Sequence, residues 1–492
     1  MSHEPWERIF GVETEFGCLV NDDSPAAPEI VAEAIKDHLF HELQIGVLDH
    51  HARDDVFEPA ESGGFLRNGG RLYIDAVGSH LEYATAESRT LNDLIANDRA
   101  GQRWIIRAIR ELGLEEMASV YNNSVDHFGG QTFGCHENYL IRAEDGVLAS
   151  SLPLLFGFLV TRQIFAGVGR VGGHRLTGSS NVSYSEMASN PVDYIWVSNV
   201  YGVVEDSSVG FQLSQRSDHI LKTVANRVRF NRALINPKWE TMYAHEGMTR
   251  LHLLFGESNQ NEHAFALKIG TTMLSIRALE EGLISDDVLL AKPLVALRNV
   301  SRDETYRWRV DRMDGTSIGA VDLQRIYLQG CEHFRGESER TDWILDAWTS
   351  ILDGLESDPL SLGDRVDWVA KRSIIEQYRV SEGLQWGDDA LHSIDLEYHN
   401  IDPEKSLFYA LQEMGGARQR VDELDILDAM TDPPQDTRAK GRAQLVEDVI
   451  AKSSRNYAFD WNSVAIGRAR HFDMPDPFQS YENPTDQWNR SE

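Results

Sequence analysis

The stretch Gly11-Val-Glu-Thr-Glu-Phe-Gly17 governs our interpretation of the whole sequence. It lies within residues 8–20, where apolar and polar residues alternate, and a period of two predicts a β-strand. Residues two apart lie on the same face of a strand, roughly 6.5–7 Å from each other, so Glu13 and Glu15 project together. Paired carboxylates flanked by glycines suit a hard cation that also holds phosphates. The alternative is two solvated glutamates on an exposed strand.

A second strand pattern, which enters a turn, occupies residues 71–83. Its alternation places three polar side chains on one face, namely Arg71, Tyr73 and Asp75. After the turn, His80 and Glu82 again share a side. A guanidinium, a phenol and several carboxylates on one surface fit a site for a nucleotide and a metal ion. The alternative is a sheet face laced with salt bridges.

Two further segments carry candidate residues. Residues 133–142 read as a strand that brings His136 and Asn138 to one face, although a lone histidine on a strand is often structural. No second histidine follows at the spacing of a zinc-protease helix. Near the C-terminus, Trp461 is either a core residue or a flat surface on which a purine stacks.

The 492-residue chain has the composition of an ordinary globular protein, with 41% hydrophobic and 25% charged residues. It contains 47 Lys plus Arg against 78 Asp plus Glu, which gives a net charge of −31. Such a charge repels phosphate backbones and anionic lipids, so it argues against a nucleic-acid or membrane partner. The excess of acidic residues is also explained simply by a need for solubility.

The sequence predicts a reduced, cytoplasmic protein. Its longest apolar run, residues 152–160, is too short to cross a bilayer. The first residues lack the basic and apolar regions of a signal peptide. The three cysteines are far apart and form neither a disulfide framework nor a zinc spacing.

The order of the predicted elements indicates an α+β protein whose sheet has one wet, functional face. We expect helices at residues 28–43, 88–112, 154–165, 271–282 and 437–450, with mainly helical structure from about 320 onward. Further strands are expected at residues 211–220 and 250–255. The polar residues 44–68 predict a long functional loop, and residues 173–208 an insertion or flap.

Familiar nucleotide and hydrolase motifs do not account for this sequence. Residues 167–172 formally match the dinucleotide fingerprint, but they follow a predicted helix rather than a strand, so we reject a Rossmann site. The sequence has no Walker motif, nucleophile elbow, HExxH or CxxC pair. Phosphate binding would therefore rely on carboxylate-bound metal and arginines.

Taken together, these motifs resemble the Pup–protein ligase (proteasome accessory factor A) family. The matching stretches occur in order from residue 8 to about 465, and they are Gly11–Gly17, Arg71–Asp75, Gly78–Thr85, Gly134–Leu140, Leu159–Gln163, Leu213–Arg216, Arg250–His252 and Asp432–Arg438. The family has a sister enzyme, the Pup deamidase/depupylase. Both belong to the glutamine-synthetase-like carboxylate–amine ligases.

The resemblance implies a large glutamine-synthetase-like domain at residues 1–420, whose curved antiparallel sheet cradles ATP and Mg²⁺, and a small C-terminal domain at residues 421–492. It implies that Mg²⁺ is held by Glu13, Tyr73 and Glu82. It also implies that ATP is contacted by Arg71, Thr85 and Trp461. Asp75 matches the catalytic acid that serves as proton acceptor. Further candidate site residues are Glu15, His136, Asn138 and Arg216.

The implied reaction uses ATP to phosphorylate the C-terminal glutamate side chain of Pup, or of a divergent Pup-like modifier. A lysine of a target protein then forms an isopeptide bond, which marks the target for proteasomal degradation. The implied partners are a modifier protein and lysine-bearing targets, with no nucleic acid and no membrane. If the modifier is acidic like this chain, a local docking groove lined by Arg or Lys is expected.

The sequence departs from the family pattern at several positions. Ala76 is an extra residue, Leu81 replaces the usual proline, and residues 237–243 keep only the acid at Glu240. The expected insertion at residues 173–208 is a further difference. These departures concern the specificity for the modifier more than the ATP site.

Three alternatives to the ligase stay open. The residues after Asp75 resemble the ligase, whereas residues 169–172 resemble the deamidase. A small-molecule carboxylate–amine ligase, which makes γ-glutamyl amides, would use ATP without a protein modifier. An inactive acidic scaffold is the non-enzyme alternative, and the presence of all the matched metal and catalytic residues argues against it.

Overall fold

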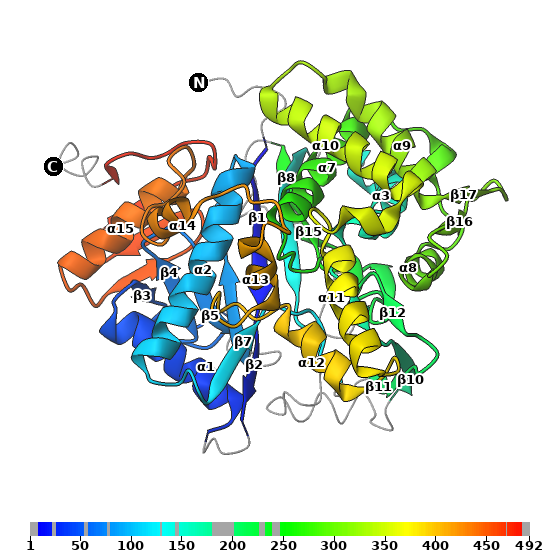
Figure 1. Cartoon of the computed structure of the whole chain (residues 1–492). Coiled ribbons are helices and arrows are strands. Elements are labelled where there is room, and N and C mark those ends of the chain that lie inside the picture. The colour runs from blue at the N-terminus through cyan, green and yellow to red at the C-terminus, as the bar shows by residue number, and fades with distance from the viewer. Residues whose placement is uncertain are drawn as a thin grey trace.

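The fold is given by a computed structural model, which describes residues 8–21, 26–53, 58–75, 79–127, 130–142, 147–179, 201–225, 232–238, 247–468 and 470–484. A large β-sheet runs through the middle of the protein, and helices pack around it (Figure 1). Ala76, Glu240 and residues 180–200 of the expected insertion lie outside the described residues.

The main sheet contains nine strands among the described residues, and these are β1 (Phe10–Glu15), β3 (Gly46–Leu48), β4 (Gly63–Leu66), β5 (Arg71–Asp75), β6 (His80–Ala84), β8 (Cys135–Arg142), β13 (Lys222–Val224), β14 (Ala233–Lys238) and β15 (Met248–Leu253). Their order across the sheet is β13-β14-β15-β8-β1-β6-β5-β4-β3. All neighbours are antiparallel except β13 and β14. The α+β class with a large antiparallel sheet is therefore confirmed.

The remaining strands form small sheets. The two-stranded ones pair β2 (Gly17–Val20) with β7 (Ala118–Tyr121), β9 (Arg170–Val171) with β12 (Phe211–Gln212), β10 (His174–Ser179) with β11 (Tyr201–Glu205), and β16 (Arg309–Asp311) with β17 (Ser317–Gly319). A three-stranded sheet near the C-terminus contains β18 (Tyr457–Phe459), β19 (Ser463–Ile466) and β20 (Arg470–Asp473).

The described α-helices are α1 (Pro28–Asp37), α2 (Leu91–Glu111), α3 (Val147–Thr161), α4 (Gln163–Ala166), α7 (Glu262–Glu280), α8 (Pro293–Arg302), α9 (Ala320–Cys331), α10 (Glu339–Ser357), α11 (Asp367–Glu382), α12 (Asp389–Glu397), α13 (Leu407–Glu413), α14 (Glu423–Ala429) and α15 (Ala439–Ala451). Shorter turns are the π-helical His38–Glu42 and the 3₁₀ segments Asp286–Val288, Glu332–Phe334 and Pro359–Leu362.

Helices cover one face of the main sheet and leave the other for polar side chains. On β5 and β6, Leu72, Ile74, Leu81 and Tyr83 form a buried core with α1 and α2. On β8 and β15, the buried apolar side chains pack with α3 and α7 in a second, larger core. The alternation in sequence therefore has the expected consequence, because the residues between these apolar positions point to the opposite face.

The expected loop at residues 44–68 also contributes two strands at the edge of the sheet, β3 and β4. Glycines made these strands hard to recognise, since glycine has a low strand propensity. In this sheet the glycines permit close approach of the neighbouring strands. A Cβ on Gly64 would lie 1.8 Å from the Val47 carbonyl oxygen, and one on Gly63 would lie 2.2 Å from the Tyr73 Cβ.

Other differences from the sequence prediction concern where strands and helices begin and end. The strand expected at residues 211–220 ends at Gln212, because side chains hydrogen-bond the backbone beyond it: Ser214 Oγ accepts from the Ser217 N–H at 3.0 Å. Strands β13 and β14 were not predicted. The helix expected at residues 271–282 begins earlier, after Asn261, whose side chain caps the first turn of α7.

The C-terminal elements pack against the edge of the main sheet. Val47 and Phe65 of β3 and β4 share a buried cluster with residues of α15 and of the β18–β20 sheet, including Leu445 and Phe459. In Figure 1 this orange and red unit lies beside the blue β3 and β4. The turn between β18 and β19 is thereby brought to the end of the main sheet.

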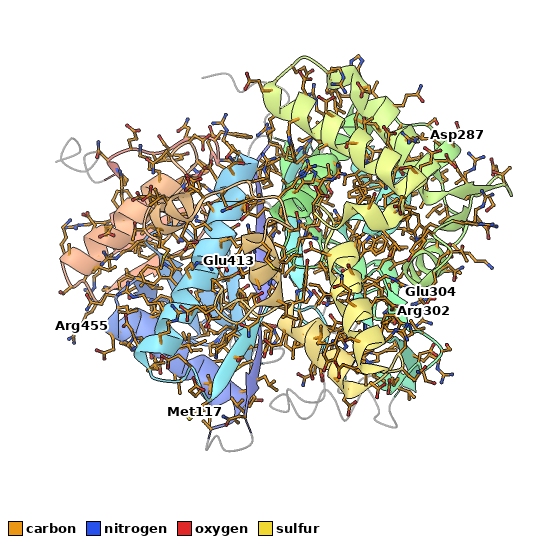
Figure 2. All side chains as sticks on the ribbon, viewed as in Figure 1. Met117, Asp287, Arg302, Glu304, Glu413 and Arg455 are labelled. Atoms are coloured by element: carbon orange, nitrogen blue, oxygen red, sulfur yellow. The ribbon has the colours of Figure 1, made fainter. Side chains whose placement is uncertain are left out.

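The surface is strongly charged. Figure 2 shows charged side chains over the periphery, with Asp287 and Arg455 at opposite edges of the molecule. Within the part of the chain that the structure describes, we find no helix with the length and apolar character needed to span a bilayer.

We predict that Gly101→Ala destabilises the fold, although alanine favours a helix by about 1 kcal/mol. The new methyl group would lie 2.3 Å from the Tyr83 ring. That ring cannot easily move, because the Tyr83 hydroxyl donates to Asn97 Oδ1 at 2.8 Å and accepts from Asn68 at 2.9 Å. A loss of about 1–3 kcal/mol is expected in chemical denaturation. An unchanged or higher unfolding midpoint would contradict this packing.

Candidate active site

The register of the strands brings the predicted polar residues together on the uncovered face. Tyr73 on β5 lies opposite Glu82 on β6, which in turn lies opposite Glu15 on β1. Glu13 lies opposite His136 on β8. Directly opposed residues of antiparallel strands share a face, so these five side chains form a continuous polar surface. The pairing expected for Glu13 and Glu15 is confirmed.

The same surface extends across β8 to β15. Asn138 lies between Gly11 on β1 and His252 on β15. Its amide donates to Glu13 Oε1 at 3.0 Å, and its side-chain oxygen accepts from Arg250 at 3.0 Å. Asn138 thus connects the carboxylate of Glu13 to the guanidinium of Arg250.

Four carboxylates of this surface influence one another. Burial raises the pKa of Glu82 well above its usual value, and the negative charges of Glu15, Asp75 and Glu13 raise it further. Glu82 is only 4% exposed, so water relieves little of this repulsion. A group of buried carboxylates with one strongly raised pKa lacks positive charge, and a bound cation would supply it.

Neighbouring histidines and two arginines lower the pKa of Glu13 and of Glu15. Burial alone would raise the pKa of Glu15, but His80 at 3.2 Å, together with His136 and Arg216, lowers it to about 2. Glu13 is likewise held well below its usual pKa, since His252, His136 and Arg250 outweigh its burial. Both carboxylates are therefore ionised at neutral pH.

Three groups of side chains place their ligand atoms within 4.8 Å of one another, and they are Glu13–His136–His252, Glu15–Asp75–His80 and Glu15–Glu82–His136. Tyr73 is next to the last group and hydrogen-bonds Glu82. Burial raises the Tyr73 pKa well above its usual value, so the phenol stays neutral. The carboxylate oxygens of these groups and the Tyr73 phenol are oxygen donors that fit Mg²⁺ or another hard cation, and each group adds at least one histidine nitrogen.

A cavity of about 360 Å³ follows this face of the sheet, and it is lined by Ile9, Phe10, Gly11, Val12, Glu13, Arg53, Glu58, Arg71, Tyr73, Ala84, Thr85, Glu87, Asn138, Tyr139, Leu140, Arg250, Arg438, Trp461 and Pro477. Six residues singled out from the sequence line it, namely Glu13, Arg71, Tyr73, Thr85, Asn138 and Trp461. Its size is suited to a small ligand such as a nucleotide.

Arg71 is held firmly in the wall of the cavity. Its Nη2 lies 3.0 Å from Asp49 Oδ2 and 3.1 Å from Glu58 Oε2. Its guanidinium carbon lies 4.3 Å from the centre of the Tyr73 ring. The buried Nε has no hydrogen-bond partner in the described structure, so Arg71 keeps a donor for a ligand.

The remaining predicted residues lie outside the lining but close to it. Asp75, with 23% of its side chain exposed, has Oδ2 at 3.8 Å from His80 Nε2. Arg216 is 5% exposed and approaches closely enough to affect the pKa of Glu15. Its Nε and Nη1 have no hydrogen-bond partner among the described residues. The carboxylate end of the site therefore also contains a buried guanidinium with free donors.

Sequence reasoning missed several charged residues of the cavity wall, namely Arg53, Glu58, Glu87, Arg250 and Arg438. Some of the signal was present, because Arg53 and Glu58 belong to the loop predicted to be functional, and Arg250 and Arg438 belong to quoted motifs. No local pattern could show that residues so distant in sequence meet around one cavity.

The fold and the site define a protein with a cavity beside a cluster of carboxylates on the polar face of an antiparallel sheet. Comparison with known proteins identifies one family. The family described as "Pup-ligase protein" matches residues 8–465. The "Pup--protein ligase" of Paenarthrobacter aurescens (strain TC1) is 34% identical over 495 residues, which cover 98% of both chains. That of Arthrobacter sp. (strain FB24) is 33% identical with the same coverage. The chain belongs to the Pup-ligase family.

Solved structures agree with this assignment. The crystal structure of the complex between the prokaryotic ubiquitin-like protein Pup and its ligase PafA aligns with a TM-score of 0.79 at 28% identity, covering 99% of this chain and 91% of that one. The structure of the Pup ligase PafA in complex with ADP aligns with a TM-score of 0.73 at 28% identity, covering 96% and 95%.

We predict that Glu82→Gln stabilises the metal-free protein above neutral pH. A carboxyl group whose pKa is raised in the folded state favours folding at low pH. This contribution to stability is lost as the pH rises through the folded-state pKa of Glu82. Removing the charge avoids that loss, and a gain of about 0.5–2 kcal/mol is typical of such substitutions. Calorimetry with a chelator at pH 8 measures it.

Glu137→Gln is the matched control. Glu137 is equally buried, but it pairs with Arg162 at 2.5 Å on the other face of the sheet. Losing its charge leaves Arg162 unpaired and should destabilise the protein. If both variants were destabilised alike, charge repulsion at Glu82 would be refuted.

Proposed function

We propose that the chain is an ATP-dependent ligase that phosphorylates the C-terminal glutamate side chain of a Pup-like modifier and joins it to lysines of target proteins. The observation that carries this proposal is the cavity between Trp461 and Glu13, because the carboxylates lie close to its Glu13 end. A nucleotide in this cavity would have its phosphates near the cation site. The similarity to PafA with Pup and with ADP supports the proposal.

In the proposed complex, ATP is contacted by Trp461, Arg71 and Thr85. The indole suits stacking on the adenine, and the guanidinium suits the anionic part. Glu13, Tyr73 and Glu82 would hold Mg²⁺, with Glu15 and His136 beside them. When bound, the ion offsets negative charge on the phosphoryl group during transfer.

The first chemical step makes the carboxylate reactive. A carboxylate does not condense with an amine in water, so its oxygen attacks the γ-phosphorus of ATP, the bond to ADP breaks, and an acyl phosphate forms. Arg216 is suited to stabilise the transferred charge, since it is buried beside Glu15 with unused donors. The amine of a lysine then attacks the acyl carbon, and phosphate leaves.

The second step needs a base, which we propose is Asp75. A lysine with the usual pKa of ~10.4 is neutral in only roughly one molecule in 2,500 at pH 7, a deficit of about 4.6 kcal/mol. A carboxylate that accepts the proton as the bond forms removes much of that cost. Asp75 is the most exposed of the four clustered carboxylates, with 23% of its side chain accessible against 18% for Glu13, which suits an incoming lysine and an outgoing proton.

A site for an acidic modifier requires local positive charge on a chain of net charge −31. A second cavity of about 580 Å³ has an excess of basic residues in its lining, with Arg8, Arg89, Arg340 and Arg420 against Glu339 and Asp436. Arg8 of this cavity is adjacent in sequence to Ile9, which lines the first cavity. We propose this surface as a candidate for the docking groove expected from the charge.

We further propose that residues 421–492 form a small C-terminal domain that closes one end of the cavity. Its β18–β19 turn carries Trp461, and its core includes side chains of β3 and β4. The proposed compartment is the cytoplasm. The three cysteines, none of them in a disulfide, are consistent with reducing conditions there.

The proposal is tested by mixing the protein with Mg·ATP, a Pup-like modifier that ends in Glu, and a lysine-bearing target. We expect a target heavier by one modifier less one water, with ATP converted to ADP and phosphate. The matched control is a modifier that lacks the terminal residue. Cleavage of a ready-made conjugate, or conversion of a C-terminal Gln to Glu without ligation, would assign the deamidase instead. Turnover with a free amino acid alone would assign a small-molecule ligase.

We predict that Asp75→Asn retains ADP binding within about twofold but loses conjugation by about 10²–10⁴-fold, the usual contribution of a general base. The loss should be smaller at high pH, where more of the attacking lysine is already neutral. Calorimetric titration with Mg·ADP and single-turnover conjugation measure the two quantities. Normal conjugation by the variant would exclude Asp75 as the base.

A further inference from the structure

A buried ion pair lies behind the wall of the nucleotide cavity and has no place in the chemistry above. Arg442 on α15 has none of its side chain exposed. Its Nη2 lies 2.5 Å from Glu87 Oε2, and its Nη1 lies 3.1 Å from Glu87 Oε1. Glu87, which lines the cavity, also accepts from Arg438 Nε at 2.7 Å. A bidentate pair of this kind fixes the guanidinium in one orientation.

Arg442 connects the segments that carry the candidate ATP contacts. Its Nη2 donates to the carbonyl oxygen of Gly69 at 2.7 Å, two residues before Arg71. Its Nη1 donates to the carbonyl oxygen of Trp461 at 2.7 Å. Its ion-pair partner Glu87 is two residues beyond Thr85. One side chain therefore ties together all three segments.

Trp461 depends on this contact more than the other two residues. It lies in the turn between β18 and β19 rather than within a strand. The Arg442 guanidinium carbon lies 4.8 Å from the centre of the indole, and the Phe65 ring contacts the indole edge-on at 5.1 Å. The indole is thus supported from behind by a cation–π contact, while its residue lines the cavity.

We propose that Arg442 is a positioning residue, which holds Trp461 at the right distance from the wall that carries Arg71 and Thr85. Glu87 provides its counter-charge. This inference rests on the proposed ATP site, and it assigns to the C-terminal unit a direct part in nucleotide affinity. Arg442 does not touch the carboxylate cluster, so it should affect nucleotide binding and leave the chemical step unchanged.

The variant that tests this is Arg442→Met. It removes the donors and the cation and keeps much of the volume of the side chain. Glu87 stays paired with Arg438, so no buried carboxylate is left without a partner. The dissociation constant of Mg·ADP should rise about tenfold, the scale of losing one base–aromatic stack. The KM for ATP should rise likewise, with kcat at saturating ATP within about twofold.

The matched control is Arg277→Met. Arg277 also pairs with a carboxylate, Glu337, and its guanidinium carbon lies 3.8 Å from the centre of the Phe334 ring, but it does not line the cavity. This variant should bind ADP like the parent. If Arg442→Met does not fold, Arg442→Lys replaces it, because lysine keeps the charge but not the planar fork. An affinity between those of the parent and Trp461→Ala is expected.

A double-mutant cycle shows whether Arg442 acts through Trp461. In a Trp461→Ala background, Arg442→Met should weaken ADP binding by less than about twofold. Parent-like ADP affinity in folded Arg442→Met, or a full tenfold additional loss in the double variant, would overturn the inference. A fall in kcat with unchanged KM would overturn it as well. If the parent protein bound no ADP, the proposed function and this inference would both fail.

Discussion

Mutual repulsion among Glu13, Glu15, Glu82 and Asp75 is the constraint on which the rest of the site depends. Burying like charges side by side is costly, and the cost appears here as a raised pKa for Glu82. The structure tolerates the arrangement because Arg216 and Arg250 add positive charge, and because His80, His136 and His252 hydrogen-bond Glu13 or Glu15. The compensation is incomplete, and incomplete compensation is the physical property that a site for a divalent cation requires.

The antiparallel sheet is the element that makes such a cluster possible. Neighbouring strands place opposed residues on one face, so a carboxylate in each of β1 and β6 is enough to bring two charges together. The opposite face of the same strands packs on α1, α2, α3 and α7. The apolar core therefore holds the strands in register, and that register sets the distances between the charges.

Prediction from sequence succeeds where the information is local. Alternation within single strands places Arg71, Tyr73 and Asp75 on one face, and the same rule places Glu13 and Glu15 on one face of their strand. It fails at the walls of the cavity, which depend on contacts between distant segments. Arg53 pairs with Asp460 at 3.1 Å across 407 positions in the sequence, and no periodicity records that contact. The edge strands β3 and β4 were missed because their glycines, needed for close approach, lower the strand signal.

The two ends of the site consequently differ in how they are held. The carboxylates themselves belong to neighbouring strands of one sheet, which the ladder hydrogen bonds and the core behind them hold in place, and Arg216 approaches them from the segment after β12. The end that contains Trp461 exists only when the C-terminal elements are docked on β3 and β4. A ligand that bridges both ends binds the docked state alone, so its binding free energy also stabilises the docking. For the proposed nucleotide, the contribution of Trp461 to affinity therefore depends on the packing of the C-terminal elements on β3 and β4, whereas the carboxylate cluster depends on the register of the main sheet.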